Sequence, residues 1–238
     1  MNFGSKKNSA EVFHHARWKL DWGSTTFTLL GINFSVVLDE IPELNYNLQI
    51  PKLHALIQQW KRRVLTPIGR VTVAKTLILP KLNHLFISLP NPKHNVNSML
   101  TKELFKFIWG SQCDKVKRSI VTQKYTSGGL HMVNLNNFLI SLKCSWIKRL
   151  ISGEQDWINI FESIYGCNVI RYLFDFGDEF VLKLVNITTN DFWKDVLESW
   201  FYVITKLMDT VHAHNSKIII IPVWYNTRIK VDKKKYIY

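Results

Sequence analysis

One stretch of the chain combines dense basic charge with dense apolar side chains and contains no acidic residue. It reads RRVLTPIGRVTVAKTLILPKL from Arg62 to Leu82, inside a longer segment, 44–102, that holds no aspartate or glutamate. Its apolar residues fall on more than one side of a helical wheel, and a helix that is apolar nearly all round is usually buried. The stretch therefore predicts a central buried helix, opened by Pro67 near its first turn, with cations at its ends and margins.

These cations have two interpretations. A solvated face on a core helix is the simpler one, but solvated faces normally mix both signs of charge. The chain has a formal net charge of +13, and residues 1–150 carry all of that excess. A strongly basic balance favours a polyanion partner, nucleic acid before an anionic membrane. We therefore expect the polyanion contact within the first 150 residues. Arg70 and Lys81 are three helical turns apart, so we expect them to lie on one face of the central helix.

Several other classes of protein find no support in the sequence. The three cysteines, Cys113, Cys144 and Cys167, are odd in number and too far apart to predict a metal motif or a disulfide framework. No apolar run reaches the length of a membrane span, and no signal peptide opens the chain. We expect an intracellular protein, nuclear or cytoplasmic, that is neither secreted nor bound to a membrane.

A polymerase needs paired carboxylates that hold two metal ions. The adjacent acids Asp39-Glu40 and Asp178-Glu179 fit helix caps or solvated loops better than a metal site. We therefore predict no catalytic residue, no metal ligand and no cofactor in this chain.

The pattern of residues predicts a mainly α fold with a small N-terminal β-hairpin and short C-terminal strands. The hairpin would pair Trp18–Trp22 with a single arm, Thr25–Val36, in which Gly31 marks a bulge or a close backbone approach. A first helix is expected over Leu44–Leu65, with Val64 on its apolar face and a kink or a late start at Pro51.

The central helix should bend at Pro80 and continue to Phe86, and Pro90–Pro92 should end it. Further helices are expected at Val96–Trp109, closed by Gly110, and at Asn134–Leu150, with a basic loop over 111–133 between them. The last predicted elements are helices near Trp157–Tyr165, Glu179–Leu184 and Asp191–Val211, followed by strands at Ile218–Ile221 and Thr227–Val231.

Two tryptophans precede clusters of basic residues. Trp60 precedes Lys61-Arg62-Arg63, and Trp109 precedes the cluster at 115–118. Aromatic rings beside cations can stack bases while the cations hold phosphates. A tryptophan on an apolar helix face is more often part of the core, so both interpretations stay open.

These motifs, in this order, resemble the C-terminal part of the polymerase of LINE-type (non-LTR) retrotransposon reverse transcriptases. Leu29-Leu30-Gly31-Ile32 resembles the leucine–glycine hairpin called the primer grip. The family's thumb signature is matched by Trp60, Arg63, Leu65, Gly69, Arg70, Lys75, Leu79, Pro80, Lys81 and Leu82. The connector after the thumb is matched by Phe107-Ile108-Trp109, Lys117 and Gly128-Gly129-Leu130.

The resemblance implies three regions: a palm remnant with the primer grip (1–38), a helical thumb (39–112) and a connector with a C-terminal helical region (113–238). The implied partners are RNA, the RNA/DNA hybrid and the missing palm domain, which would hold Mg²⁺ through two aspartates that have no counterpart in this chain. We expect a truncated fragment that grips nucleic acid without catalysing polymerisation. The expected nucleic-acid contacts are Gly31, Arg63, Arg70, Lys75, Lys81, Lys115, Lys117 and Arg118.

Two rival hypotheses remain at this point. A basic helical scaffold that binds a protein partner would use its charge only for solubility. An active polymerase would require that the true product extend upstream of Met1 into palm sequence.

Overall fold

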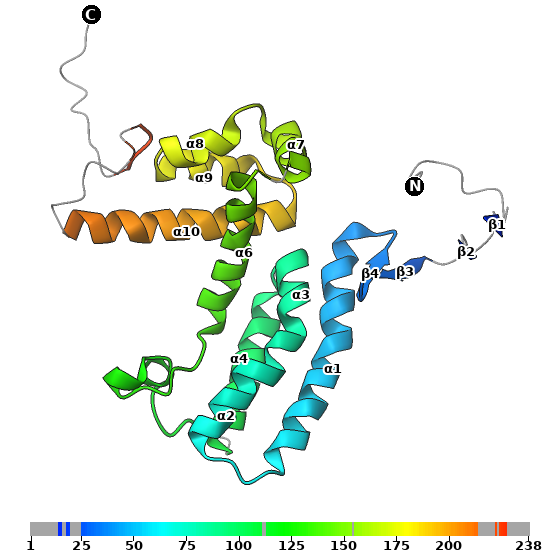
Figure 1. Cartoon of the computed structure of the whole chain (residues 1–238), viewed down its shortest axis with the longest axis vertical. Coiled ribbons are helices and arrows are strands. Elements are labelled where there is room, and N and C mark those ends of the chain that lie inside the picture. The colour runs from blue at the N-terminus through cyan, green and yellow to red at the C-terminus, as the bar shows by residue number, and fades with distance from the viewer. Residues whose placement is uncertain are drawn as a thin grey trace, which may run out of the picture.

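In the computed structural model the chain is mainly α-helical, with a small β-hairpin before the first long helix, as predicted (Figure 1). The structure describes residues 14–15, 18–19, 25–110, 113–153, 155–213, 222 and 224–227. The predicted strand at Ile218–Ile221 lies outside these residues, as does that at Thr227–Val231 apart from Thr227 itself. No helix in the described part of the chain is long and apolar enough to cross a membrane.

The N-terminal hairpin is shorter than predicted and turns at a different place. Strand β3 (Thr26–Leu29) pairs antiparallel with β4 (Ile32–Ser35), so the predicted single arm folds back on itself. Leu30 and Gly31 form the turn with φ values of +50° and +78°. Two successive positive φ values match the right-handed twist of a hairpin, so Gly31 serves the turn rather than a bulge. Upstream, β1 (His14–His15) pairs with β2 (Trp18–Lys19).

A 3-10 turn, η1 (Leu38–Glu40), leads into α1 (Ile41–Lys61), a helix of 21 residues that continues through Pro51. The buried Asn45 of α1 clamps the hairpin: its Oδ1 accepts from the Asn33 N–H at 2.8 Å, and its Nδ2 donates to the Asn33 carbonyl at 2.7 Å. Because α1 ends at Lys61, the expectation that Val64 joins its apolar face is wrong, and Val64 is fully exposed.

The central helix begins at Pro67 and continues past Pro80, as predicted, but it is not one regular α-helix. It consists of α2 (Pro67–Val73), a π-helical turn η2 (Ala74–Ile78) and α3 (Pro80–Ser88). The Leu79 N–H donates to the Ala74 carbonyl, five residues back, at 2.9 Å. Proline has no N–H, and in a regular helix its ring would clash with the carbonyl four residues earlier. The wider π-helical turn lies just before Pro80. It changes the spacing of the carbonyls that precede the proline, including the one with which its ring would otherwise clash.

The remaining elements largely follow the predicted helices. Helix α4 (His94–Trp109) ends at Gly110, whose φ of +64° gives the predicted left-handed cap. The predicted basic loop contains α5 (Arg118–Val121) and a 3-10 turn, η3 (Tyr125–Ser127). The helices that follow are α6 (Leu135–Ile151), α7 (Gln155–Tyr165), α8 (Val169–Asp175), α9 (Asp178–Ile187) and α10 (Asp191–Ala213). Of these, the sequence analysis missed only the short α8.

Two hydrophobic clusters form the core, and α6 contributes to both. The first runs from Ile41 to Leu139 and includes the buried side of the central helix. The second runs from Trp146 to Ile204 and joins α6 to the C-terminal helices. In Figure 1, α6 extends from the group of α1–α4 to the group of α7–α10. The first cluster crosses residue 112, where the sequence analysis divided thumb from connector; that division stays a prediction.

A fully buried lysine connects the two clusters. Lys143 of α6 donates from Nζ to the carbonyl of Leu89, and Nζ lies 4.5 Å from the centre of the Phe192 ring. Burial lowers the pKa of Lys143 to about 8, while the charge of Asp195 partly opposes this shift. Burial raises the pKa of Asp195. The charged form of Lys143 therefore depends on partners from the α3–α4 connection and from α10.

We predict that Lys143→Ala lowers the free energy of unfolding by about 3–5 kcal/mol, because it empties a fully buried position and leaves the half-buried Asp195 without a nearby positive charge. The double variant Lys143→Met/Asp195→Asn should lose much less, since the amide oxygen introduced at position 195 could still accept from the Asn91 N–H. Urea unfolding of both variants tests this. Equal losses in the single and the double variant would contradict it.

The pH dependence of the same unfolding gives a second test. An unfolded lysine has a pKa of about 10.4, so between pH 8 and 9 the unfolded chain keeps a proton that the folded chain releases. The free energy of unfolding of the wild type should therefore rise by about 1 kcal/mol over this interval relative to the double variant.

Candidate nucleic-acid interface

The basic loop, residues 113–133, folds into a compact unit. The N–H groups of Leu130 and Met132 both donate to the Val121 carbonyl at 3.1 Å, and the His131 N–H donates to the Gln123 carbonyl at 2.8 Å. Gly129 permits this return, because a Cβ there would lie 2.1 Å from the Gln123 carbonyl oxygen. The loop therefore presents its cations from an ordered backbone.

Arg118 attaches this loop to α4. Its Nε donates to Asp114 Oδ2 at 2.7 Å, and its guanidinium lies 4.8 Å from the centre of the Phe105 ring. Lys115 and Lys117 are exposed beside it, and neither has an acidic partner among the described residues. The cation–π contact therefore involves Phe105 rather than Trp109, the ring that the sequence placed beside this cluster.

Lys75 joins the π-helical turn to the basic loop. Its Nζ donates to the His131 carbonyl at 3.2 Å. It also lines a cavity of about 370 Å³ together with Thr122, Asn134 and Asn137. Asn134 is the N-cap of α6, and its side chain accepts from the Asn137 N–H at 3.2 Å. The positive end of the α6 dipole and the Lys75 ammonium thus border one concave surface.

Arg70 is placed differently from the expectation. Its Nη1 donates to the Phe107 carbonyl at 3.0 Å, and its guanidinium lies against the end of α4 next to Gly110. Arg70 and Lys81 do not share a helix face, because the π turn adds a residue between them and shifts later side chains by about 100°. Lys81 is exposed, whereas Arg70 binds the Phe107 carbonyl near the C-terminus of α4.

The remaining expected contacts lie at the two ends of α1. Arg63 follows its C-terminus, and the Arg63 guanidinium stands 4.7 Å from the centre of the Trp60 ring. Trp60 is partly buried against the first cluster, as is Trp109, so both rings contribute to the core. Gly31 lies in the hairpin beside the N-terminal end of α1, and no atom beyond its two chain neighbours lies within 4 Å of where its Cβ would be.

The structure brings Lys75, Lys115, Lys117 and Arg118 into one region, with Arg63, Lys81 and Gly31 placed elsewhere on the surface.

The sequence analysis did not predict the buried hydrogen bonds of Asn45, although an asparagine within an apolar helix is a detectable signal of a buried contact. Asp178 is the first residue of α9 but does not cap it, because the N-cap is Gly177 and no side chain caps this helix. Asp178 is buried and accepts from the Thr227 N–H at 3.0 Å, so the predicted cap or solvated loop is wrong. No group of three or more metal-ligating side chains occurs in the described ranges.

No protein-family model matches the chain.

We predict that Gly110→Ala destabilises the protein by displacing Arg70. The new Cβ would lie 2.2 Å from Arg70 Nη1, and the left-handed backbone adds a further cost of about 1–2 kcal/mol. Gly128→Ala is the matched control, since Gly128 also has a positive φ, +76°, but open space around its Cβ. Chemical denaturation should show a larger loss for Gly110→Ala. Equal losses would mean that the Arg70 contact contributes nothing measurable.

Proposed function

We propose that this chain grips the phosphate backbone of nucleic acid, as a thumb and connector fragment of a non-LTR retrotransposon reverse transcriptase. One observation carries the proposal: exposed cations on α1–α4 and on the basic loop have no acidic partner in the described part of the chain. They are Lys52, Arg62, Arg63, Lys81, Lys102, Lys115, Lys117 and Lys124. A surface of one sign is favourable when phosphates neutralise it.

The proposed phosphate contacts are Arg63, Lys75, Lys81, Lys115, Lys117 and Arg118. Arg70 would act by positioning, because its guanidinium holds α2 against α4. The C-terminal region supports this assignment by contrast, since Arg171 and Lys183 are each paired with an acid one helical turn away. Arg171 and Lys183 are thus balanced by neighbouring acids, whereas the eight cations named above have no acidic partner in the described part of the chain.

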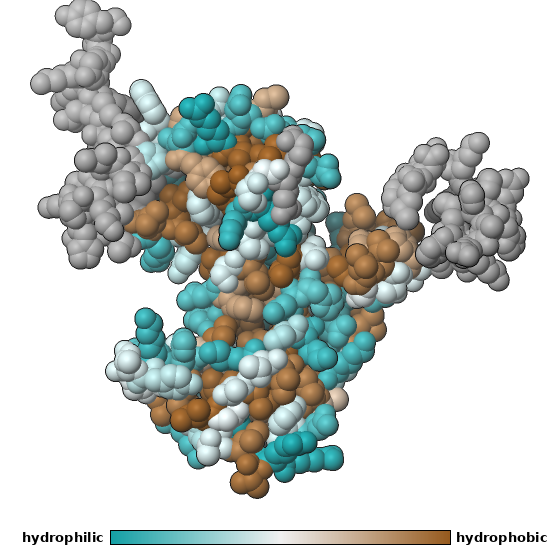
Figure 2. Space-filling model, in the orientation of Figure 1, coloured by the Kyte–Doolittle hydropathy of each residue, from teal (hydrophilic) through white to brown (hydrophobic). Residues whose placement is uncertain are grey.

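The hairpin is the proposed contact with the missing palm domain. Leu30 is 91% exposed, Leu38 75% and Val36 70%, so apolar side chains gather on and just after β3–β4. Figure 2 shows this hydrophobic surface beside the end of α1. Exposed apolar patches of this kind are typical of protein interfaces. In this proposal Gly31 lets the hairpin turn come close to the primer strand.

The proposal assigns no catalytic step to this chain. Polymerisation would require the palm, whose paired aspartates hold the metal ions in the family that the sequence resembles. The purified chain, given template-primer, Mg²⁺ and deoxynucleotides, should therefore not extend the primer. Extension that stays with the protein through successive purification steps would contradict this.

The central experiment is the salt dependence of binding to RNA and to an RNA/DNA hybrid. Each phosphate contact should add about −0.7 to −0.9 to the slope of log K against log salt. The double variant Lys115→Gln/Lys117→Gln should reduce this slope by about two contacts.

The matched control is Arg171→Gln/Lys183→Gln, which removes two cations that already have acidic partners. It should leave the slope unchanged. If the wild type shows no salt-dependent binding, the proposal fails and the scaffold hypothesis is favoured.

A further inference from the structure

The β3–β4 hairpin has one closed edge and one open edge. Strand β4 contacts α1, and β3 lies on the side away from this helix (Figure 1). No third strand joins these two in the described part of the chain. All residues of β3 are exposed, whereas those of β4 are partly buried. An open edge strand is a template on which another strand can pair.

The side chain of Asn45 closes the edge of β4. Asn45 Oδ1 accepts from the Asn33 N–H at 2.8 Å, and Asn45 Nδ2 donates to the Asn33 carbonyl at 2.7 Å. A residue on a neighbouring antiparallel strand would make the same pair of hydrogen bonds. The Asn45 amide therefore takes the place of a third strand beside β4.

The register of the hairpin shows which backbone groups face the open edge of β3. The Val36 N–H donates to the Thr25 carbonyl at 3.2 Å. Hydrogen-bonded and non-hydrogen-bonded pairs alternate along an antiparallel ladder, so Thr26 and Thr28 form non-hydrogen-bonded pairs with β4. Their N–H and C=O groups therefore point outward from β3, where no described residue pairs with them.

We propose that β3 pairs antiparallel with β3 of a second copy of this chain, about a twofold axis beside Phe27. Thr26 of each copy exchanges N–H···O=C hydrogen bonds with Thr28 of the other, so every outward N–H finds a carbonyl. Two hairpins of two strands each then form one antiparallel sheet in the order β4–β3–β3–β4. A lone hairpin is marginally stable, and added strands with an apolar face stabilise it.

The side chains of β3 suit this pairing. Phe27 is 45% exposed and Leu29 50%, although both lie on the face of the hairpin that carries Phe34. The rings of Phe27 and Phe34 stack with their centroids 5.3 Å apart. In the proposed sheet the two copies of Phe27 lie directly opposite each other, in a non-hydrogen-bonded pair where side chains come closest. The stacked rings of both hairpins therefore form one aromatic row.

Charge also favours a second copy at this place. Residues 22–38 contain no charged residue, whereas the whole chain has a formal net charge of +13. Two copies therefore repel each other on average, and the neutral hairpin lets them approach without adding to that repulsion. Because Asn45 closes the outer edge of each hairpin, pairing stops at two copies and does not continue into a fibre.

This inference does not rest on the proposed nucleic-acid grip, and a palm domain on the hairpin would compete with the second copy for β3. Sedimentation equilibrium of the full-length chain, freed of nucleic acid, tests it. The mass should rise with protein concentration from that of one chain to that of two. Added salt should strengthen the dimer, because it screens the repulsion between basic chains.

Three variants locate the contact. Phe27→Lys sets like charges directly opposite each other and should weaken the dimer at least about tenfold. Leu30→Lys is the matched control, because it adds the same charge at an exposed position in the turn, outside the paired strands. It should change the dissociation constant less than about twofold. Thr28→Pro removes an outward N–H but none that bonds to β4, and should also weaken the dimer.

Amide exchange followed by NMR reports the pairing in the wild type itself. The N–H groups of Thr26 and Thr28 should become protected as the protein concentration rises. The variants are compared once circular dichroism shows that they are folded; if Phe27→Lys does not fold, Thr28→Pro and the wild-type exchange still decide.

Four results would overturn the proposal. They are a wild type that stays monomeric up to about 1 mM, growth beyond two copies, a dimer whose Thr26 and Thr28 amides stay unprotected, and equal dimers from Phe27→Lys and Leu30→Lys. A dimer that separates in high salt would also overturn it, since that behaviour indicates two copies bridged by nucleic acid. The salt slope of nucleic-acid binding is measured separately, so failure of the dimer leaves the proposed function standing.

Discussion

The ammonium group of Lys143 meets the end of the central helix, and the two halves of the molecule depend on that contact. The last carbonyls of a helix have no partner within it. At the end of α3, the Leu89 carbonyl accepts from Lys143, and the Ile87 carbonyl accepts from Trp146 Nε1 at 2.8 Å. Asp195 of α10 binds the next segment through the Asn91 N–H. A positive charge at a helix C-terminus is favourable, so α6 and α10 stabilise the point at which the central helix stops.

Sequence patterns predicted the elements whose ends carry their own signals. Thr66 with Pro67, Gly110 and Asn134 mark helix ends by side-chain chemistry that acts within one turn. The π turn left no such mark, because a stretch that is apolar nearly all round looks the same after one extra residue. The turn at Leu30-Gly31 was missed because strand-forming residues lie on both sides and a leucine occupies one of the positive φ positions.

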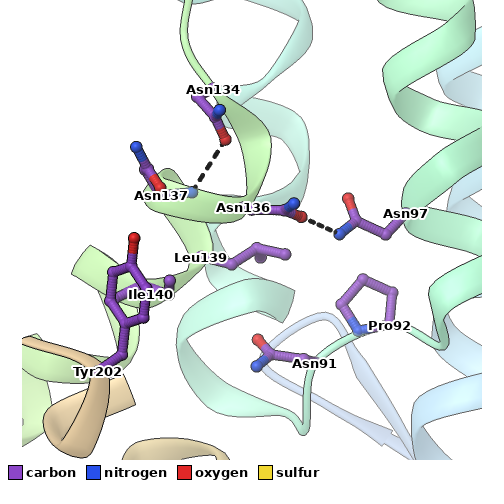
Figure 3. A pocket seen from close by; sticks show the side chains of 9 residues that line it. All are labelled: Asn91, Pro92, Asn97, Asn134, Asn136, Asn137, Leu139, Ile140 and Tyr202. Atoms are coloured by element: carbon purple, nitrogen blue, oxygen red, sulfur yellow. Dashed lines mark hydrogen bonds between the residues drawn. The ribbon is translucent and has the colours of Figure 1, made fainter. Parts of the chain in front are cut away.

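The sequence also predicted the candidate interface only in part. Charge counting placed the basic excess in the first 150 residues, but it could not distinguish Arg70 from Lys81. Arg70 meets its partner, the carbonyl of Phe107, across 37 positions, and only the fold brings them together. The sequence did not predict the cavity of about 440 Å³ beside the start of α6 (Figure 3), because its lining residues are uncharged and come from four separate segments.

Because α6 belongs to both clusters, the chain has no point at which it divides into two self-sufficient pieces. Leu135 and Leu139 complete the first cluster, while Trp146 and Leu150 complete the second. A cut in the short link after Ile151 would sever the backbone and still leave α7–α10 packed on the end of α6. The two fragments would then stay associated as a non-covalent complex, because each would bury apolar surface that the other needs covered in order to fold.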